Sequence, residues 1–245
     1  MYLWTQDSIR FRIDAAEYTG YDAAIAARIL PGLPKNACVC DAGCGLGYLS
    51  LALSTGCARV AAVDSSGEAL DVLRENIARR RAANIDVYQD DLFSMRPEPR
   101  YDAMVFCFFG RAEETLRAVK RQCSGNAYLV KKNWRNHRFT MTETPLKGYT
   151  LSHTVRELSA MAVPFAQETF PVEMGQPFRS LEDAVLFFRT YRQQGEAEVS
   201  PEQVLALLRP NDSKKYPLFL PSYQQLGLIT VRAEDIPERF GDMES

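Results

Sequence analysis

The sequence predicts an α/β fold in which a parallel sheet is covered by helices on both faces. Between residues 37 and 133, short apolar runs typical of buried strands alternate with segments of helical periodicity. This alternation favours a parallel sheet, because parallel strands are joined by crossover connections that are usually helical. The chain has 245 residues, which is enough for one large α/β domain with a substantial core.

Five runs in the first half of the chain are expected to be strands, since they are rich in β-branched, aromatic and small apolar residues. They are residues 37–43, 58–64, 84–91, 101–109 and 126–133. Helices are expected between them and before them. They are residues 22–30, 47–55, 113–123 and a segment that begins at Ser65 or Ser66 and carries an apolar stripe of Leu70, Leu73 and Ile77.

The second half is less regular, but two helix starts are well marked. Ser180 with Asp183, and Ser200-Pro201 with Gln203, have the spacing of helix-capping residues. We also expect a helix at 153–162, a strand at 166–174 and a last strand at 226–233. The predicted organisation is a single domain, residues 1–245, with an N-terminal helical cap (1–35), a core (36–174), a helical insertion that serves as a lid (175–222), and a last strand and tail (223–245).

Composition and charge narrow the function classes. Lys and Arg total 29 and Asp and Glu total 31, so the net charge is -2. This balance disfavours, without excluding, a protein that works mainly by neutralising phosphates. The opening residues do not resemble a signal peptide, and the longest apolar run, 103–109, is too short to cross a bilayer. We therefore expect a soluble, cytoplasmic protein with no membrane partner. The six cysteines form no CxxC pair or Cys/His cluster, so no metal site is expected.

The most informative segment is VCDAGCGLGYLSLAL at residues 39–53. A predicted strand ends at Asp41, passes through Gly43, Gly45 and Gly47, and enters a predicted helix. Glycines allow close approach of the backbone to a ligand and permit dihedral angles that other residues avoid. The spacing differs from the G-x-G-x-x-G pattern of dinucleotide-binding proteins, and Asp41 would repel a pyrophosphate but suits a ligand with a free ammonium group.

Acidic residues end three successive predicted strands. Asp64 follows the second strand, where a carboxylate can accept hydrogen bonds from both ribose hydroxyls, and Asp91 follows the third, where it can accept from an adenine amine. Together with Asp41 they form a row along the edge where open α/β sheets bind ligands. Asp90 is expected to be solvated instead.

This pattern resembles the class I S-adenosylmethionine-dependent methyltransferases, closely over residues 36–133 and loosely elsewhere. The resemblance implies that Asp41, Gly43, Gly45 and Gly47 hold the methionine part of S-adenosylmethionine, that Asp64 binds its ribose and that Asp91 binds its adenine. It also implies a seven-stranded sheet with an antiparallel last strand, and a substrate lid before that strand. Further cofactor contacts expected from the resemblance are Cys44, Ser65, Leu92, Phe106 and Tyr18.

The segment after the fourth strand departs from one branch of this family. Methyltransferases that act on exocyclic amines of bases carry an N/D-P-P-Y/F signature there, whereas this chain has Phe106, Cys107, Phe108, Phe109 and Gly110. Methylation of exocyclic base amines is therefore disfavoured. Cys107 is better explained as a pocket or core residue than as a nucleophile. No catalytic residue is evident, and His137 and His153 are the only weak candidates.

A basic segment, KKNWRNHR at 131–138, follows the fifth strand. It is either a solvated basic turn or a local anion site, in which case Trp134, Arg135 and Arg138 would contact the substrate, because guanidinium groups suit carboxylate and phosphate. The sequence leaves both interpretations open.

The function predicted from the sequence is transfer of a methyl group from S-adenosylmethionine, which becomes S-adenosylhomocysteine, to a small and anionic acceptor by in-line displacement. An RNA methyltransferase that uses residues 131–138 to bind its substrate is the first alternative, and a non-catalytic S-adenosylmethionine-binding protein is the second. A nicotinamide-dependent dehydrogenase is disfavoured by the glycine spacing. The sequence specifies neither the acceptor atom nor the oligomeric state.

Overall fold

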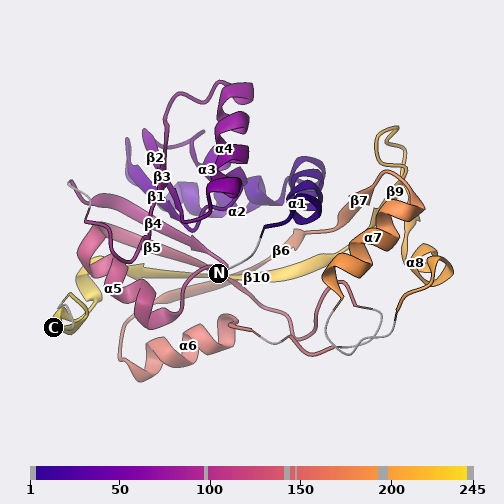
Figure 1. Cartoon of the computed structure of the whole chain (residues 1–245). Coiled ribbons are helices and arrows are strands. Elements are labelled where there is room, and N and C mark those ends of the chain that lie inside the picture. Colours follow the sequence, from indigo (N-terminus) through magenta and orange to yellow (C-terminus); the bar gives the residue numbers. More distant parts are fainter. Residues whose placement is uncertain (1–3, 97–98, 141–143, 147, 193–197, 242–245) are drawn as a thin grey trace. The chain divides into compact units, whose positions relative to one another are not determined.

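The central feature of the computed structural model is a seven-stranded sheet with the strand order β3-β2-β1-β4-β5-β10-β6 (Figure 1). The structure describes residues 4–96, 99–140, 144–146, 148–192 and 198–241. Strands β1 to β5 pair in parallel, and β10 runs antiparallel to β5, which confirms the predicted fold class. The strands of this sheet are β1 (Cys38–Ala42), β2 (Arg59–Asp64), β3 (Ile85–Gln89), β4 (Tyr101–Cys107), β5 (Cys123–Lys132), β6 (Ala166–Glu173) and β10 (Tyr223–Arg232).

Helices lie between the strands as the alternating pattern predicts. The α-helices are α1 (Gln6–Thr19), α2 (Tyr21–Ile29), α3 (Tyr48–Leu53), α4 (Gly67–Arg80), α5 (Ala112–Gln122), α6 (Leu151–Ala160), α7 (Leu181–Tyr191) and α8 (Pro201–Leu207). Short 3-10 helices occur at η1 (Leu30–Gly32), η2 (Ala233–Asp235) and η3 (Glu238–Phe240). Ser66, rather than Ser65, caps α4, because its side chain accepts from the Ala69 backbone N–H.

The backbone contacts divide the chain into two compact units. We call residues Asp22–Asn133, Tyr149–Phe170 and Gln225–Ser245 the sheet unit, and residues Met1–Tyr21, Trp134–Gly148 and Pro171–Gln224 the accessory unit. The predicted insertion, 175–222, falls wholly in the accessory unit, although its residues 193–197 lie outside the described part of the chain. The predicted N-terminal cap is split, since α1 belongs to the accessory unit and α2 to the sheet unit.

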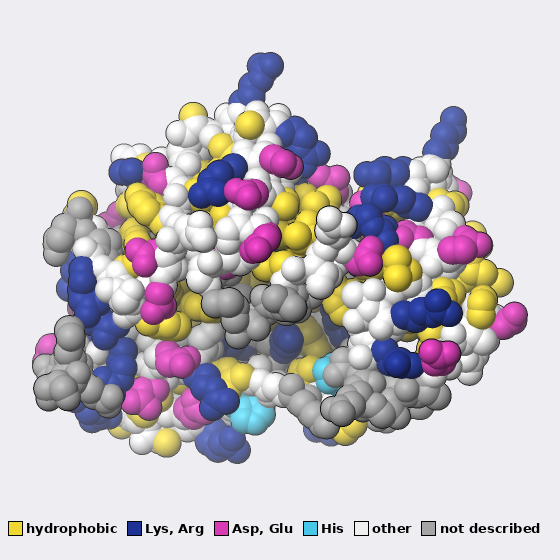
Figure 2. Space-filling model, viewed as in Figure 1, with side chains coloured by type: hydrophobic (Ala, Val, Ile, Leu, Met, Phe, Trp, Pro, Cys, Tyr) yellow, Lys and Arg dark blue, Asp and Glu magenta, His cyan; other side chains and the backbone are white. Residues whose placement is uncertain are grey.

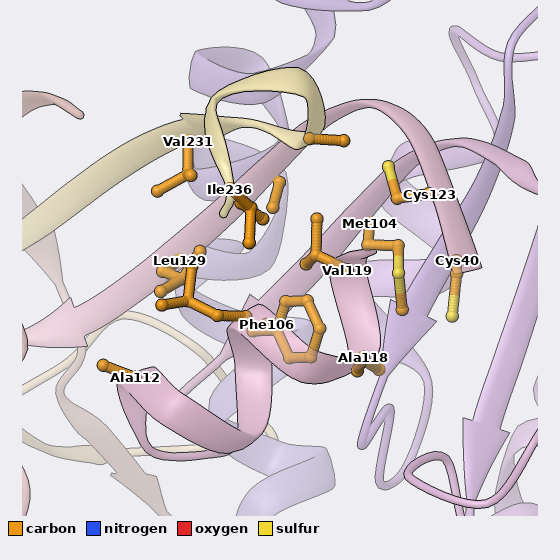
Figure 3. Close-up of a cluster of buried hydrophobic side chains, with 14 of the residues drawn as sticks. Cys40, Met104, Phe106, Ala112, Ala118, Val119, Cys123, Leu129, Val231 and Ile236 are labelled. Carbon is orange, nitrogen blue, oxygen red and sulfur yellow. The ribbon is translucent and has the colours of Figure 1, made fainter. Parts of the chain in front are cut away.

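The core of the sheet unit is built on both faces of the sheet. On one face, Val119 of α5 packs with strand residues such as Phe106 and Leu129 (Figure 3). Leu116 of α5 and Leu158 of α6 belong to the same cluster. On the other face, α3 and α4 cover the sheet with a separate cluster of Leu51, Ala62, Leu70 and Leu73 (Figure 1). Apolar residues of α3, α4, α5 and α6 thus cover both faces of the sheet, as a mostly parallel sheet requires.

The accessory unit contains elements that the sequence did not reveal. Inside the predicted insertion, β7 (Gln176–Phe178), β9 (Leu218–Leu220) and β8 (Arg209–Pro210) form a small antiparallel sheet beside α7 and α8. Helix α1 lies within the predicted helical cap, 1–35, but its bounds were not predicted, because its residues RFRID alternate between polar and apolar as a strand would. In the structure, Asp14 of α1 is buried and is held by Arg179 and by the Tyr216 hydroxyl.

An aromatic cluster forms the core of the accessory unit. Phe187 of α7 is fully buried, and its ring contacts Phe11 of α1, Phe139, Phe178 and Tyr191 at centroid distances of 4.7–5.3 Å. Most of these rings meet edge to face, which is the arrangement that aromatic quadrupoles favour. The cluster therefore joins elements that are far apart in the sequence into one unit.

Replacing Phe187 by Ala should lower the free energy of unfolding of the accessory unit by about 3–5 kcal/mol, since it leaves a cavity among these rings. The change can be measured by urea unfolding followed by tryptophan fluorescence, because both tryptophans, Trp4 and Trp134, lie in this unit. Leu186→Ala is the matched control, since Leu186 precedes Phe187 on α7 and is 37% exposed. Equal destabilisation by both variants would contradict the prediction.

Candidate functional site

The glycine-rich turn leads from β1 into α3 and is held against β2. The backbone N–H groups of Gly43 and Cys44 donate to the carbonyl oxygen of Val63, at 2.9 and 3.0 Å. Gly43, Gly45 and Gly47 all have positive φ, at 68°, 53° and 73°, a region that favours glycine. A Cβ atom on Gly47 would lie only 2.1 Å from Cδ1 of Leu73, so this position also requires glycine for lack of space.

Asp64, at the end of β2, is oriented by the backbone on both sides. Its Oδ2 accepts from the N–H of Gly45 at 2.8 Å, and its Oδ1 accepts from the N–H of Ser66 at 2.9 Å. The first bond ties Asp64 to the glycine turn, and the second ties it to the start of α4. A carboxylate oxygen has more than one acceptor position, so both oxygens retain acceptor capacity toward a ligand.

Asp41, the acid before the first glycine, is buried. It is 1% exposed, and its Oδ2 accepts a hydrogen bond of 2.5 Å from the Ser50 hydroxyl on α3. Burial raises the pKa of Asp41 to about 7, the Ser50 hydrogen bond lowers it, and the negative charges of Asp22 and Asp64 raise it further. Asp41 is thus protonated over part of the physiological range, and a nearby cation would favour its ionised form.

The segment after β3 combines an exposed acid with buried apolar residues. Asp91 is exposed, and its Oδ1 accepts from the backbone N–H of Phe93 at 3.1 Å. Leu92 is buried, and its carbonyl accepts from the Gln122 side chain of α5. The Phe93 ring stacks on Phe109, with centroids 5.5 Å apart. The acid therefore remains accessible while its neighbours anchor the loop to the core.

Phe109 brings the end of β4 against the glycine turn. A Cβ atom on Gly43 would lie 2.5 Å from the Phe109 ring, so the ring occupies the space that glycine leaves open. The preceding residue, Phe108, has a φ of 56°, and Gly110 has a φ of 67°. A left-handed conformation is unusual for a bulky residue, and such outliers cluster at functional sites.

The other predicted cofactor contacts differ in their exposure and in the unit to which they belong. Cys44 is half-buried, Ser65 is exposed, and Phe106 is fully buried in the core of the sheet unit (Figure 3). Burial raises the pKa of the Cys44 thiol well above its ordinary value. Tyr18 lies in the accessory unit, where its hydroxyl donates to the Asn211 side chain at 2.8 Å. As cofactor contacts, all four stay predictions, and the position of Phe106 offers no exposed surface for this role.

A pocket of about 260 Å³ opens beside the ends of β4 and β5. It is lined by Phe108, Gly110, Arg111, Glu114, Lys131, Lys132 and Tyr149. Lys131 is 2% exposed, and its ammonium group donates to the carbonyl oxygens of Phe109 and Gly110 at 2.7 and 2.8 Å. Burial lowers the pKa of Lys131 to about 8.

The structure divides the basic segment 131–138 between the two units. Lys131 and Lys132 are the last residues of β5, whereas Trp134, Arg135 and Arg138 belong to the accessory unit. Arg135 is exposed. Arg138 donates to the carbonyl oxygen of Met174 and lies over the Phe139 ring, and burial lowers its pKa to about 10. The segment is therefore not one solvated basic turn.

The two histidines have different surroundings. His153 lies in the first turn of α6, where its Nδ1 is 2.7 Å from Oγ1 of Thr150 and accepts from the Thr150 backbone N–H, so it takes part in capping the helix. His137 is half-buried, its backbone N–H donates to Thr144, and its Nε2 is a buried atom without a partner among the described residues. A catalytic role for either residue stays a prediction.

Sequence reasoning missed the pocket residues Gly110, Arg111 and Tyr149. The Tyr149 hydroxyl makes two hydrogen bonds, since it accepts from the Ala112 N–H and donates to Glu157 at 2.5 Å. The one usable signal was Lys131, a charged residue that continues the apolar run AYLV of a predicted strand. Within the described ranges, no group of three or more His, Cys, Asp or Glu residues could hold a metal ion, and no helix is long and apolar enough to span a membrane.

The turn and the acids fit the cofactor that the glycine pattern implies. The turn is open enough only because its glycines carry no Cβ atom, and Asp64 has acceptor capacity on both oxygens next to it. The negative charge of Asp64 reaches Asp41, whose pKa it raises, so the two acids lie in one region. Acids suit the hydroxyl and ammonium groups of S-adenosylmethionine and would repel a pyrophosphate.

Comparisons with known proteins find methyltransferases of similar fold. Residues 39–126 match the protein-family model described as a methyltransferase domain, and no curated protein matches the chain by sequence. A candidate methyltransferase from Bacillus halodurans has a TM-score of 0.54 at 16% identity, over 86% of this chain and 98% of the other. Magnesium protoporphyrin IX methyltransferase from Synechocystis, solved with S-adenosylhomocysteine bound, has a TM-score of 0.53 at 13% identity, over 95% and 89%. A candidate RNA methyltransferase from Pyrococcus horikoshii has a TM-score of 0.50 at 14% identity, over 87% and 84%.

The structural similarities, at these low identities, show a shared fold, and the family match adds the activity class. The match over residues 39–126 and the shared fold support a class I, S-adenosylmethionine-dependent methyltransferase. The same findings support an enzyme whose methyl donor is S-adenosylmethionine.

The buried Asp41 predicts an inverse dependence of stability on pH in the absence of cofactor. Its folded-state pKa of about 7 lies above the value of about 3.9 in the unfolded chain. Between these values the folded state binds a proton that the unfolded state lacks, so Asp41 makes the free energy of unfolding fall as pH rises, until the loss is complete above about pH 7. Asp41→Asn should remove this loss, which is on the order of 2–4 kcal/mol.

Urea unfolding of both proteins at about pH 5 and about pH 8 checks this prediction. Asp41→Asn should gain stability relative to the original chain as pH rises. Asp71→Asn is the control, because Asp71 is an exposed acid on α4. A difference between Asp41→Asn and the original chain that is independent of pH would contradict it.

Proposed function

We propose that this enzyme transfers the methyl group of S-adenosylmethionine to a small, anionic acceptor by in-line displacement. The observation that carries the cofactor part is the arrangement of Asp64, whose two oxygens are fixed by the N–H groups of Gly45 and Ser66 next to the glycine turn. In this proposal Asp64 binds the ribose hydroxyls, Asp91 binds the adenine amine, and the turn at Gly43–Gly47 holds the methionine part.

The sulfonium of the cofactor supplies an electrophilic methyl group, so the chain has to position the reactants and exclude water rather than activate a poor donor. The N–H groups of the turn donate hydrogen bonds to the Val63 carbonyl and the Asp64 carboxylate, which would hold the proposed cofactor-binding surface in place before the ligand binds. The protonation state of Asp41 depends on nearby charges, because its pKa is about 7 and an ammonium group close to it would favour the ionised form. Transfer without a metal stays a prediction, as does the lid role of 175–222.

The proposed acceptor is small because the charge of the protein does not favour a large polyanion. The chain has a net charge of -2, and on the face shown in Figure 2 the Lys and Arg side chains are interspersed with Asp and Glu. It is anionic because cationic side chains follow β5, where acceptors reach the carboxyl edge of the sheet. Arg135, which is exposed, is the side chain of segment 134–138 most open to such a molecule.

RNA is the second candidate acceptor. One of the structurally similar proteins is described as a candidate RNA methyltransferase. An RNA acceptor would bind through several Lys and Arg residues at once, and its affinity would fall steeply with salt concentration. A small anion held by one or two cations would show a shallow dependence on salt.

The cofactor assignment predicts a large thermal shift with S-adenosylhomocysteine. At about 100 times its Kd the ligand should add about 2.7 kcal/mol to stability, or roughly 5–10 °C in Tm for a chain of this size. NAD should give no shift. Asp64→Ala should lose most of the shift because the ribose hydroxyls lose their acceptor.

Differential scanning fluorimetry of the full chain measures these shifts. Asp86→Ala serves as the control, since Asp86 is an acid on β3 that pairs with Arg59 outside the turn. A shift with NAD and none with S-adenosylhomocysteine would refute the cofactor assignment.

The acceptor assignment predicts that Arg135→Ala raises the KM for an anionic acceptor about tenfold or more, at about 1.4 kcal/mol per factor of ten. Loss of a charged hydrogen bond of about 1.5–3 kcal/mol accounts for an effect of this size. Cofactor affinity should not change. Steady-state kinetics at two salt concentrations measure both points, and a steep fall of acceptor affinity with salt would favour RNA instead. Arg138 is less suited to this test, because its substitution also removes the hydrogen bond to Met174.

A further inference from the structure

The pocket beside β4 and β5 lies wholly within the sheet unit and next to the glycine turn. Its lining comes from the end of β4, the start of α5, the end of β5 and Tyr149, all of which belong to this unit. Phe109, between the lining residues Phe108 and Gly110, packs against Gly43. A molecule in the pocket would therefore lie near the predicted position of the methionine part of the cofactor.

Lys131 has one donor left for a ligand. A Lys ammonium group has three N–H donors. Two of them go to the carbonyl oxygens of Phe109 and Gly110, and among the described residues Lys131 makes no further hydrogen bond or ion pair. Because Lys131 is 2% exposed and lines the pocket, the third N–H lacks bulk water as a ready partner.

The ring of Tyr149 gathers two cationic groups at this pocket. The Lys131 Nζ lies 5.5 Å from the ring centre, and the Arg111 Cζ lies 5.8 Å from it. Cations are attracted to the face of an aromatic ring. The Tyr149 ring is itself fixed, since its hydroxyl is bonded to Ala112 and Glu157. Lys132 adds a third cation, with its Nζ 6.0 Å from the Phe108 ring centre.

The positive charges of the pocket outnumber its negative ones. Glu114 is the one acid among the lining residues, and its carboxylate accepts from the Arg111 backbone N–H, where it caps α5. The Arg111 guanidinium is exposed and has no ion pair among the residues that the structure describes. Lys131 and Arg111, beside one carboxylate that already caps α5, form a site that an oxyanion would complete.

We propose that this pocket binds an oxyanion of the methyl acceptor, a carboxylate or a phosphate, through the third N–H of Lys131 and the guanidinium of Arg111, with Lys132 adding to the attraction. The proposal rests on the proposed function in one respect, that the bound anion belongs to the acceptor. Guanidinium and ammonium groups match the geometry and charge of both oxyanions. The pocket volume of about 260 Å³ suits one small molecule rather than a folded nucleic acid.

Two small probes test the pocket directly, malonate for carboxylates and inorganic phosphate for phosphates. Each is titrated into the full chain at constant ionic strength while backbone amide NMR signals are recorded. We expect saturable binding of at least one probe, with the largest shifts at Gly110, Arg111 and Lys132. Binding of malonate alone or phosphate alone identifies the acceptor's oxyanion, and binding of neither overturns the proposal.

Arg111→Gln is the decisive variant, because Arg111 is exposed and its backbone N–H remains to bond Glu114. Affinity for the probe should fall tenfold or more. Arg74→Gln is the matched control, an exposed Arg on α4 outside the pocket, and should leave affinity unchanged. Equal affinity in the original chain and in Arg111→Gln would overturn the proposal.

Lys131 is tested by pH, since its substitution could disturb the loop that it holds. Probe affinity should fall as pH rises through about 8, where Lys131 loses its charge. Cys107 on β4, Glu114 on α5 and Glu157 on α6 also face Lys131, whereas Tyr149 has a pKa raised to about 12. Cys107→Ser should keep the fall in affinity. A fall that disappears in Cys107→Ser, or affinity independent of pH, would remove Lys131 from the site.

The same samples separate this proposal from the proposed function. Failure of the proposed function would appear as no thermal shift with S-adenosylhomocysteine while the probe still binds. Failure of the pocket proposal would appear as a normal shift with S-adenosylhomocysteine and no probe binding that depends on Arg111.

Discussion

Three hydrogen bonds donated by backbone N–H groups hold the glycine turn to strand β2, and the rest of the site is arranged around them. The N–H groups of Gly43 and Cys44 donate to Val63, and the N–H of Gly45 donates to the Asp64 carboxylate. These bonds need the parallel register of β1 with β2, which places Ala42 beside Val63. The turn also has positive φ angles at Gly43, Gly45 and Gly47, which glycine adopts without strain. Any side chain at Gly47 would force Leu73 of α4 away, so the turn and the packing of α4 depend on each other.

Charge is distributed unevenly along the carboxyl edge of the sheet. Asp41 is the last residue but one of β1, Asp64 is the last residue of β2, and Asp91 follows β3. By contrast, β5 ends in Lys131 and Lys132. Strand β4 lies between the two groups, and a Phe-Phe-Gly segment follows its last residue, Cys107. The acids suit a cofactor that carries an ammonium group, a sulfonium and ribose hydroxyls, and the lysines suit an acceptor of the opposite charge. Burial acts on both groups in the same sense, since it disfavours the charged form and shifts the pKa of Asp41 up and that of Lys131 down.

Much of the fold was accessible from the sequence, and the candidate cofactor site could be predicted from it, because both depend on local patterns. The five strands from β1 to β5, the helices between them and the caps of α7 and α8 follow from periodicity and capping residues that act within a few positions. The row of Asp41, Asp64 and Asp91 follows from strand ends alone. The small sheet of β7, β8 and β9 could not be predicted, because strands of two or three residues are too short for a periodic pattern. The bounds of helix α1 could not be predicted within the helical cap, 1–35, because residues RFRID alternate between polar and apolar as a strand would.

The sequence by itself determined that strands alternate with helices, that a glycine turn follows β1 and that acids end the first strands, since each of these depends on neighbouring residues. Only the tertiary structure decided which side chains share a pocket. Residues 131–138 are continuous in sequence, yet Lys131 is buried in the sheet unit, whereas Arg138 packs on Phe139 in the accessory unit. Likewise, Tyr149 reaches the start of α5 by a hydrogen bond to Ala112 across 37 positions. Such contacts form only when long stretches of chain close around a packed core. The free energy of this closure comes from many residues that are far apart in the sequence, so no local pattern reveals it.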